Sequence, residues 1–187
     1  MYSIVEFSHI LAKDFIMNSN KDLSILDATC GEGNDTYFLS KILNDHKYNH
    51  HLDAYDIQDN AINHTKEKCK EFNFIDYHLD SHENINPLNY DLIIFNLGYL
   101  PKGNKLITTK AESTLRVVKN IIESMKNKDI LLIISVYIGH NEGMRESIEL
   151  EKLLINLDKS CFQVYKYQSL NQVNSPYVLS IRKKHYE

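Results

Sequence analysis

Residues 27–36, Asp-Ala-Thr-Cys-Gly-Glu-Gly-Asn-Asp-Thr, decide the fold class of this chain. They follow an apolar run at 23–26 and lead into apolar residues at helical spacing over 37–43. A strand, an acidic residue, a glycine turn and a helix in this order predict an open α/β sheet that holds an adenosine-containing cofactor at the carboxyl ends of its strands. Gly31 and Gly33 suit this turn, because a side chain would block close approach of a ligand to the backbone. Many such turns make hydrogen bonds only with their own backbone. Residues further along the chain are therefore needed to distinguish a cofactor site from a purely structural turn.

The composition is that of an ordinary globular protein, with 187 residues, 43% of them hydrophobic and 25% charged. This length suits a single domain spanning residues 1–187. No stretch approaches the roughly 18 apolar residues that a membrane span needs, and the first residues show no signal-peptide pattern. Cys30, Cys69 and Cys161 are odd in number and form no CxxC pair. We therefore expect reduced thiols in a cytoplasmic protein, with no metal site.

The charges are unevenly distributed. A formal net charge of −4 argues against a broad nucleic-acid footprint. Basic residues nevertheless gather at the end of the chain, over 182–184, and within one shorter region that contains Lys102, Lys105, Lys110, Arg116 and Lys119. A small local footprint on RNA therefore stays open.

Apolar spacing predicts alternating helices and strands along the whole chain. Helices are expected over about 4–16, 35–44, 58–71, 109–126 and 145–157. Strands are expected over about 23–29, 52–56, 74–79, 91–96, 130–136, 161–168 and 177–183. This alternation predicts a Rossmann-like, doubly wound and mostly parallel seven-stranded sheet. The last two strands have no helix between them, so we expect them to form an antiparallel pair.

Polar residues follow the second and third predicted strands. Asp56 lies about 20–25 residues beyond the glycines, where an acid can accept hydrogen bonds from ribose hydroxyls, although it can also simply cap the next helix. The segment 80–83, Asp-Ser-His-Glu, includes His82, which could contact an adenine edge or be a solvated loop histidine.

The fourth predicted strand ends in residues 96–101, Asn-Leu-Gly-Tyr-Leu-Pro. The side-chain oxygen of Asn96 can accept hydrogen bonds from an amine, and the ring of Tyr99 can stack on a planar base. A tight turn would explain Gly98 and Pro101 but neither the asparagine nor the tyrosine. The pattern therefore favours chemistry at a nitrogen atom.

The remaining candidates are weaker. The loop after the fifth strand contains His140, which could be a base, a substrate contact or a structural residue. No GxxxxGK[ST] sequence is present, so a P-loop is excluded. The spacing around His50 and His51 resembles no metal triad. Cys30 and Cys69 are best interpreted as small buried side chains.

Taken together, these motifs resemble a class I S-adenosylmethionine-dependent methyltransferase, and more narrowly the small bacterial family named for rRNA methylation. Members of that family methylate the amine of 5-aminomethyl-2-thiouridine, the wobble uridine of tRNA. The resemblance is carried by residues 27–36, 56–58, 81–83 and 96–101, and by Gly139 and His140 with Gly143 and Glu146.

The resemblance implies roles for individual residues. S-adenosylmethionine would be bound by Asp27, Thr29, Gly31, Gly33, Asn34, Asp35, Thr36, Asp56, Gln58, Ser81, His82 and Asn96. Asn96, Tyr99 and His140 would be catalytic, and the substrate side would include Leu97, Gly98, Lys102, Lys105 and Lys110. The implied partners are the tRNA anticodon region and a second copy of the chain in a homodimer.

The sequence departs from the family pattern at Glu32, which brings a negative charge close to the cofactor where the family has asparagine. Three alternatives remain. One is a methyltransferase of rRNA or of a small-molecule amine, and another is a non-catalytic RNA-binding module. The third is an NAD-dependent oxidoreductase, which Thr36 disfavours because it stands where the final glycine of the dinucleotide motif would be.

Overall fold

The computed structural model describes residues 2–97, 111–139 and 141–184. These residues form five α-helices, α1 (Ile4–Met17), α2 (Asn34–Asp45), α3 (Asp59–Lys68), α4 (Ala111–Ser124) and α5 (Asn141–Ile155). The same residues form seven strands, β1 (Ser24–Asp27), β2 (His51–Asp56), β3 (Ile75–Leu79), β4 (Leu92–Leu97), β5 (Leu131–Val136), β6 (Phe162–Gln168) and β7 (Tyr177–Lys183). Two short 3-10 helices, η1 (His82–Asn84) and η2 (Pro87–Asn89), lie between β3 and β4.

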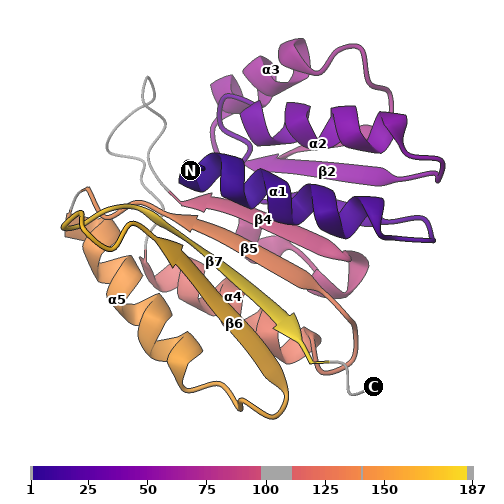
Figure 1. The fold of residues 1–187 in the computed structure, drawn as a ribbon. Helices are drawn as coiled ribbons and strands as arrows, with labels where there is room; N and C mark the ends of the chain where they lie inside the picture. Colours follow the sequence, from indigo (N-terminus) through magenta and orange to yellow (C-terminus); the bar gives the residue numbers. More distant parts are fainter. Residues whose placement is uncertain (1, 98–110, 140, 185–187) are drawn as a thin grey trace.

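The strands form one sheet in the order β3-β2-β1-β4-β5-β7-β6 (Figure 1). The first five strands run parallel to their neighbours. Strand β7 is antiparallel to both β5 and β6. The predicted fold class and the antiparallel C-terminal pair are therefore confirmed, and the carboxyl ends of β1 to β5 share one edge of the sheet. We call this edge the rim.

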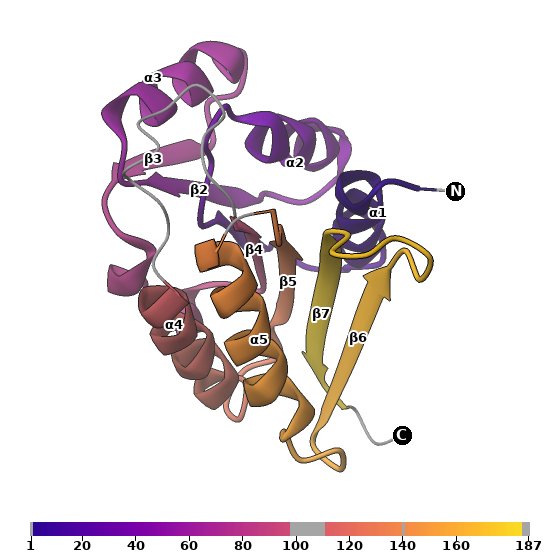
Figure 2. The ribbon, with the colours of Figure 1, turned by 90° about the vertical axis from the view of Figure 1, so that its left-hand side faces the viewer.

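Helices cover both faces of the sheet (Figure 2). Helices α1, α2 and α3 contribute to one buried hydrophobic cluster, together with side chains such as Ile25 and Leu52. Helices α4 and α5 contribute to the other, together with Leu26 and Phe95. Consecutive residues of β1 enter opposite clusters because side chains alternate along a strand. Within the described chain, no helix is long and apolar enough to cross a membrane.

Several element boundaries differ from the expected ones. Strand β1 ends at Asp27 rather than at residue 29, because the Asp27 carboxylate accepts the backbone N–H of Thr29 and turns the chain. Helix α5 begins at Asn141, four residues earlier than the apolar spacing predicts, since its first three residues, Asn-Glu-Gly, carry no apolar side chain and give no periodic signal. Neither short 3-10 helix was predicted.

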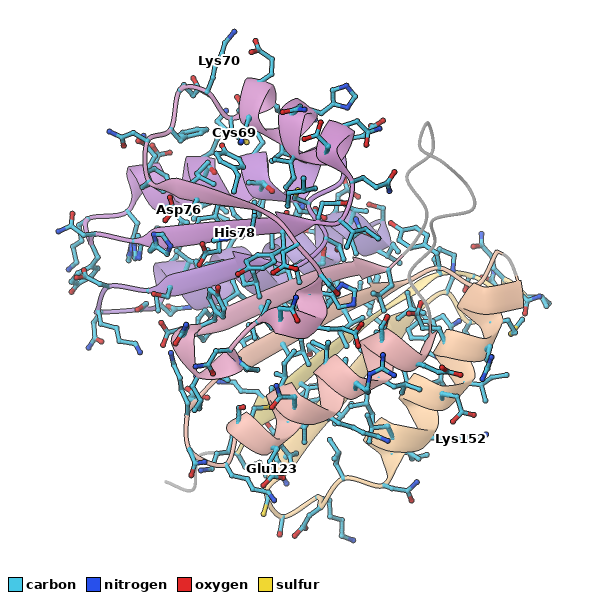
Figure 3. The ribbon with its side chains drawn as sticks, turned by 180° about the vertical axis from the view of Figure 1, so that it is seen from behind. Cys69, Lys70, Asp76, His78, Glu123 and Lys152 are labelled. Carbon is cyan, nitrogen blue, oxygen red and sulfur yellow. The ribbon has the colours of Figure 1, made fainter. Side chains whose placement is uncertain are left out.

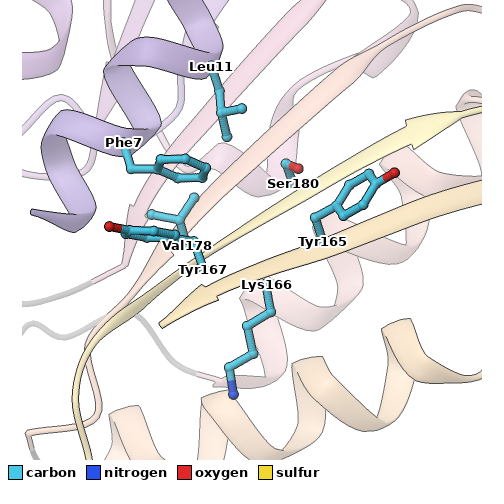
Figure 4. A pocket seen from close by; sticks show the side chains of 7 residues that line it. All are labelled: Phe7, Leu11, Tyr165, Lys166, Tyr167, Val178 and Ser180. Carbon is cyan, nitrogen blue, oxygen red and sulfur yellow. The ribbon is translucent and has the colours of Figure 1, made fainter. Parts of the chain in front are cut away.

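Helix α1 is held against the C-terminal strands. The ring of Phe7 stacks on Tyr167 of β6 with 4.0 Å between centroids, and the Tyr167 hydroxyl donates a hydrogen bond to the carbonyl of Tyr2 at 2.9 Å. Beside this stack lies an apolar cavity of about 240 Å³ between α1 and β6–β7, and no candidate site residue lines it (Figure 4). Its lining consists of Phe7, Leu11, Tyr165, Lys166, Tyr167, Val178 and Ser180.

Candidate active site

The rim brings together the ends of β2 and β4 and the segment that follows β1. The hydroxyl of Thr29 accepts the backbone N–H of Asn96 at 2.8 Å and lies 3.3 Å from the Asn96 carbonyl oxygen. On the other side, the backbone N–H of Gly31 donates to the carboxylate of Asp56 at 3.0 Å. Three segments that are far apart in the sequence therefore form one continuous hydrogen-bonded surface.

The glycine turn is built from two left-handed residues, Gly31 with φ of 52° and Gly33 with φ of 74°. A Cβ atom on Gly33 would lie 2.9 Å from the backbone Cα of Thr65 in α3. The structure thus gives a different reason for this glycine from the one expected. Gly33 is required by its φ angle and by close packing against α3, and not by the approach of a ligand alone.

Asp56 organises the turn through both carboxylate oxygens. One accepts the N–H of Gly31 and the other accepts the N–H of Gln58 at 2.9 Å, just before α3 begins. Burial raises the pKa of Asp56 above its ordinary value, and these backbone hydrogen bonds oppose the rise. Asp56 does not cap α3, because the N-cap residue is Gln58 and the helix has no side-chain cap hydrogen bond. Since each oxygen of Asp56 can accept a second hydrogen bond, its contacts with Gly31 and Gln58 leave acceptor capacity for a ribose hydroxyl.

Asp27, the last residue of β1, is fully buried. It accepts the hydroxyl of Thr36 at 2.6 Å and the backbone N–H of Thr29 at 3.2 Å. Burial, and secondarily the negative charge of Asp35, raise the pKa of Asp27 to about 7. The group therefore titrates close to neutral pH.

This pKa predicts how stability depends on pH. In the unfolded chain Asp27 ionises near its ordinary pKa of 3.8, so between about pH 4 and pH 7 the folded state binds the extra proton. The contribution of Asp27 to stability therefore falls as pH rises through this window, by on the order of 3 kcal/mol. Relative to Asp27→Asn, the cofactor-free wild type should lose several degrees of melting temperature, roughly, between pH 5 and pH 8. Asp45→Asn, an exposed site at the end of α2, is the matched control in these thermal unfolding curves. Wild-type and Asp27→Asn curves that run parallel would contradict the prediction.

Asp35 joins the turn to Asn96 and to a residue that the sequence did not single out. One of its carboxylate oxygens accepts the side-chain amide of Asn96 at 3.0 Å, and the other lies 2.6 Å from Nε2 of His9 in α1. Burial raises the pKa of Tyr137, whose hydroxyl hydrogen-bonds the Asn96 side chain. His9 and Tyr137 were missed because helical spacing marked 4–16 only as a packing helix and Tyr137 belongs to no motif.

His82 is buried and not a solvated loop histidine. Its side chain is in edge contact with Phe95 at 5.5 Å between centroids, and Ser81 caps the short helix in which it lies. Burial lowers the pKa of His82, so the neutral ring is favoured. Its Nε2 atom is buried and has no hydrogen-bond partner among the described residues. A ligand with a polar edge would satisfy this atom, which fits an adenine.

Other expected site residues have structural partners. Asn34 accepts a hydrogen bond from Lys68, and the side chain of Leu97 is 1% exposed within the hydrophobic core. Because the Leu97 side chain faces the interior, the expected place of Leu97 on the substrate side concerns its backbone and stays a prediction. Tyr99, Gly98, Lys102, Lys105, Lys110 and His140 lie outside the described residues.

Two of the basic residues that the sequence singled out, Arg116 and Arg182, are paired with acidic side chains. Arg116 forms an ion pair with Glu83 through its NH2 group at 2.6 Å. Arg182 pairs with Asp129 at 2.8 Å, at the end of β7 that lies opposite the rim. The C-terminal basic residues therefore cannot extend an RNA footprint at this site.

A second polar cluster lies away from the rim, on β2 and β3, where Asp76 and His78 are seen in Figure 3. His51, Asp53 and Asp76 offer ligand atoms within 4.8 Å of one another, a grouping that spacing along one strand could not predict. Asp53, however, already accepts a hydrogen bond from Tyr90 and contacts His78, and the Asp76 side chain is 71% exposed. We interpret this cluster as a hydrogen-bonded surface network.

The chain is similar in sequence and in structure to known methyltransferases. A family model described as Putative rRNA methylase matches residues 52–183. A protein of Arabidopsis thaliana named tRNA (mnm(5)s(2)U34)-methyltransferase, chloroplastic, is 31% identical over 195 residues, which covers 96% of this chain and 69% of the relative.

Two solved structures resemble the chain over nearly its full length. A crystal structure titled as a putative rRNA-methylase from Clostridium thermocellum has a TM-score of 0.83 and 29% identity, covering 98% of this chain and 99% of that one. A crystal structure titled as a putative methyltransferase from Streptococcus mutans in complex with SAH has a TM-score of 0.81 and 32% identity, with the same coverage.

Proposed function

Because the chain belongs to the putative rRNA methylase family and is an S-adenosylmethionine-dependent methyltransferase, we propose that it methylates the exocyclic amine of 5-aminomethyl-2-thiouridine at the wobble position of tRNA. The product would be 5-methylaminomethyl-2-thiouridine. The 31% identical relative, which is named for this modification, supports the choice of acceptor.

The rim has the features that an adenosine cofactor needs. The buried, unpartnered Nε2 of His82 fits an adenine edge, and Asp56 keeps acceptor capacity for a ribose. The turn from Gly31 to Thr36, with the buried carboxylate of Asp27 behind it, would hold the methionine end. When bound, S-adenosylmethionine supplies a methyl group that its positively charged sulfur has already activated.

One observation carries the proposal for an amine acceptor. Asn96 lies at the end of β4 beside the glycine turn, and its amide nitrogen donates to Asp35. The Tyr137 hydroxyl also hydrogen-bonds this side chain, and since the amide oxygen has two acceptor positions, at least one remains for an N–H group of the amine. An oxygen acceptor at this position orients a neutral amine whose lone pair can attack the methyl group. Proximity and orientation would then supply most of the rate.

Nucleoside mass spectrometry of tRNA from a strain that lacks the gene tests this function. We expect 5-aminomethyl-2-thiouridine to accumulate and its methylated form to disappear, with recovery when the wild-type gene is restored. Restoring an Asn96→Ala gene is the matched control and should not rescue. Unchanged tRNA nucleosides together with loss of a methylated nucleoside from rRNA would overturn the tRNA proposal in favour of an rRNA substrate.

A further inference from the structure

We propose that Asp35 and His9 are positioning residues that hold the Asn96 side-chain amide with its oxygen toward the methyl acceptor. This inference rests on the proposed function only in taking that acceptor to be an amine. Neither residue has to touch the reacting atoms, since both act through Asn96.

The carboxylate of Asp35 decides which way the amide of Asn96 points. The carboxylate oxygen of Asp35 accepts a hydrogen bond at 3.0 Å from Asn96, and the donor is the Nδ2 amide nitrogen. The opposite rotamer would set the amide oxygen against the carboxylate oxygen, which is repulsive. The Asn96 oxygen is therefore directed away from Asp35.

The direction of this amide matters for the chemistry. An amine acceptor donates its N–H groups to an oxygen and keeps its lone pair free for the methyl group. A reversed amide would present N–H groups to that lone pair and would oppose the reaction. The orientation set by Asp35 thus separates a productive arrangement from an unproductive one.

Asp35 is itself held in place by its surroundings. Its side chain is 9% exposed, and its second oxygen lies 2.6 Å from Nε2 of His9. It also stands in the first turn of α2, where the N-terminal end of the helix favours a negative charge. Both carboxylate oxygens are therefore occupied by donors from different elements.

His9 is positioned by packing that involves no other candidate site residue. Its ring stacks on Phe38 of α2, with centroids 3.8 Å apart and an angle of 7° between the planes. The same helix, α1, is anchored two residues earlier by the stack of Phe7 on Tyr167 (Figure 4). Helix α1 therefore contacts Asp35 through His9, and Asp35 in turn accepts the side-chain amide of Asn96.

Two substitutions of His9 separate positioning from simple packing. His9→Phe keeps a ring against Phe38 but removes the donor to Asp35, whereas His9→Gln keeps a donor and removes the ring. In single-turnover assays on an anticodon stem-loop that carries 5-aminomethyl-2-thiouridine, we expect His9→Phe to lower the rate about tenfold and His9→Gln to recover most of it. The dissociation constant of S-adenosylmethionine, measured by calorimetry, should stay near the wild-type value in both variants.

A second measurement does not depend on the substrate. The side-chain amide signals of Asn96, identified in an NMR spectrum of the cofactor-bound protein by their loss in Asn96→Ala, report directly on its hydrogen bond. We expect them to be preserved in His9→Gln and to move in Asp35→Asn, because the new amide can face Asn96 with either its oxygen or its nitrogen.

The outcomes are distinguishable. Unchanged Asn96 signals in Asp35→Asn, or equal rates for His9→Phe and His9→Gln, would overturn the positioning role. An increase in the cofactor dissociation constant that by itself accounts for the slower reaction would also overturn it, since Asp35 would then act on the cofactor. If the wild type does not methylate the stem-loop, the proposed function fails, and the NMR comparison still decides the role of Asp35.

Discussion

Asn96→Ala is expected to lower the rate constant of methyl transfer by about 100-fold or more, while the dissociation constant of S-adenosylmethionine changes less than about threefold. The substitution removes the oxygen that orients the acceptor amine. It leaves in place the backbone hydrogen bonds between Asn96 and Thr29 that join β4 to the glycine turn. The substitution should therefore slow methyl transfer without weakening the binding of S-adenosylmethionine to a similar extent.

Single-turnover rates with excess enzyme, together with calorimetric titration of S-adenosylmethionine, measure the two quantities. Asp56→Ala is the matched comparison and should show the opposite pattern, with weaker cofactor binding first, because Asp56 holds the backbone of Gly31 and Gln58. Asn96→Ala also leaves one oxygen of Asp35 without its donor, so its melting temperature has to be measured alongside. A loss of affinity as large as the loss of rate would refute the orienting role.

Gly33→Ala is expected to lower the free energy of unfolding by about 3 kcal/mol or more, which corresponds to a fall of roughly 6–12 °C in melting temperature. Two effects add. The left-handed φ of 74° is unfavourable for any residue with a Cβ atom, and that atom would lie 2.9 Å from the Cα of Thr65. To relieve the clash between the new Cβ atom and Thr65, α3 would have to move away from the glycine turn.

Thermal and urea unfolding of the cofactor-free protein test this prediction, and Gly139→Ala is its control. A Cβ atom on Gly139 would meet nothing within 4 Å, so that variant should keep nearly the wild-type stability. We expect Gly33→Ala to weaken cofactor binding too, because α3 follows directly from Asp56 and Gln58. Wild-type stability in Gly33→Ala would show that the turn can relax, contrary to the packing observed.

Sequence patterns alone were enough to predict a mostly parallel sheet, the succession of helices and strands along the chain, and the segments that meet at the rim. Apolar runs and helical spacing are local signals, and the short connections between them leave few topologies. The glycine turn, Asp56 and Asn96 could therefore be placed on one edge before any contact was known, because parallel strands align their carboxyl ends. The interpretation of Cys30 and Cys69 as small buried side chains is also confirmed.

Contacts between side chains of different helices and strands could not be predicted and are known from the folded structure. His9 reaches Asp35 because α1 crosses the sheet at one particular register, and nothing in the periodicity of α1 marks that residue. Leu97 turns inward because side chains alternate along β4, although it belongs to the motif that begins at Asn96. Gly33 is needed for the packing of α3, a neighbour 32 residues further along the chain at Thr65. Such contacts depend on how whole elements pack, and a pattern along one segment contains no information about the partner that packing will supply.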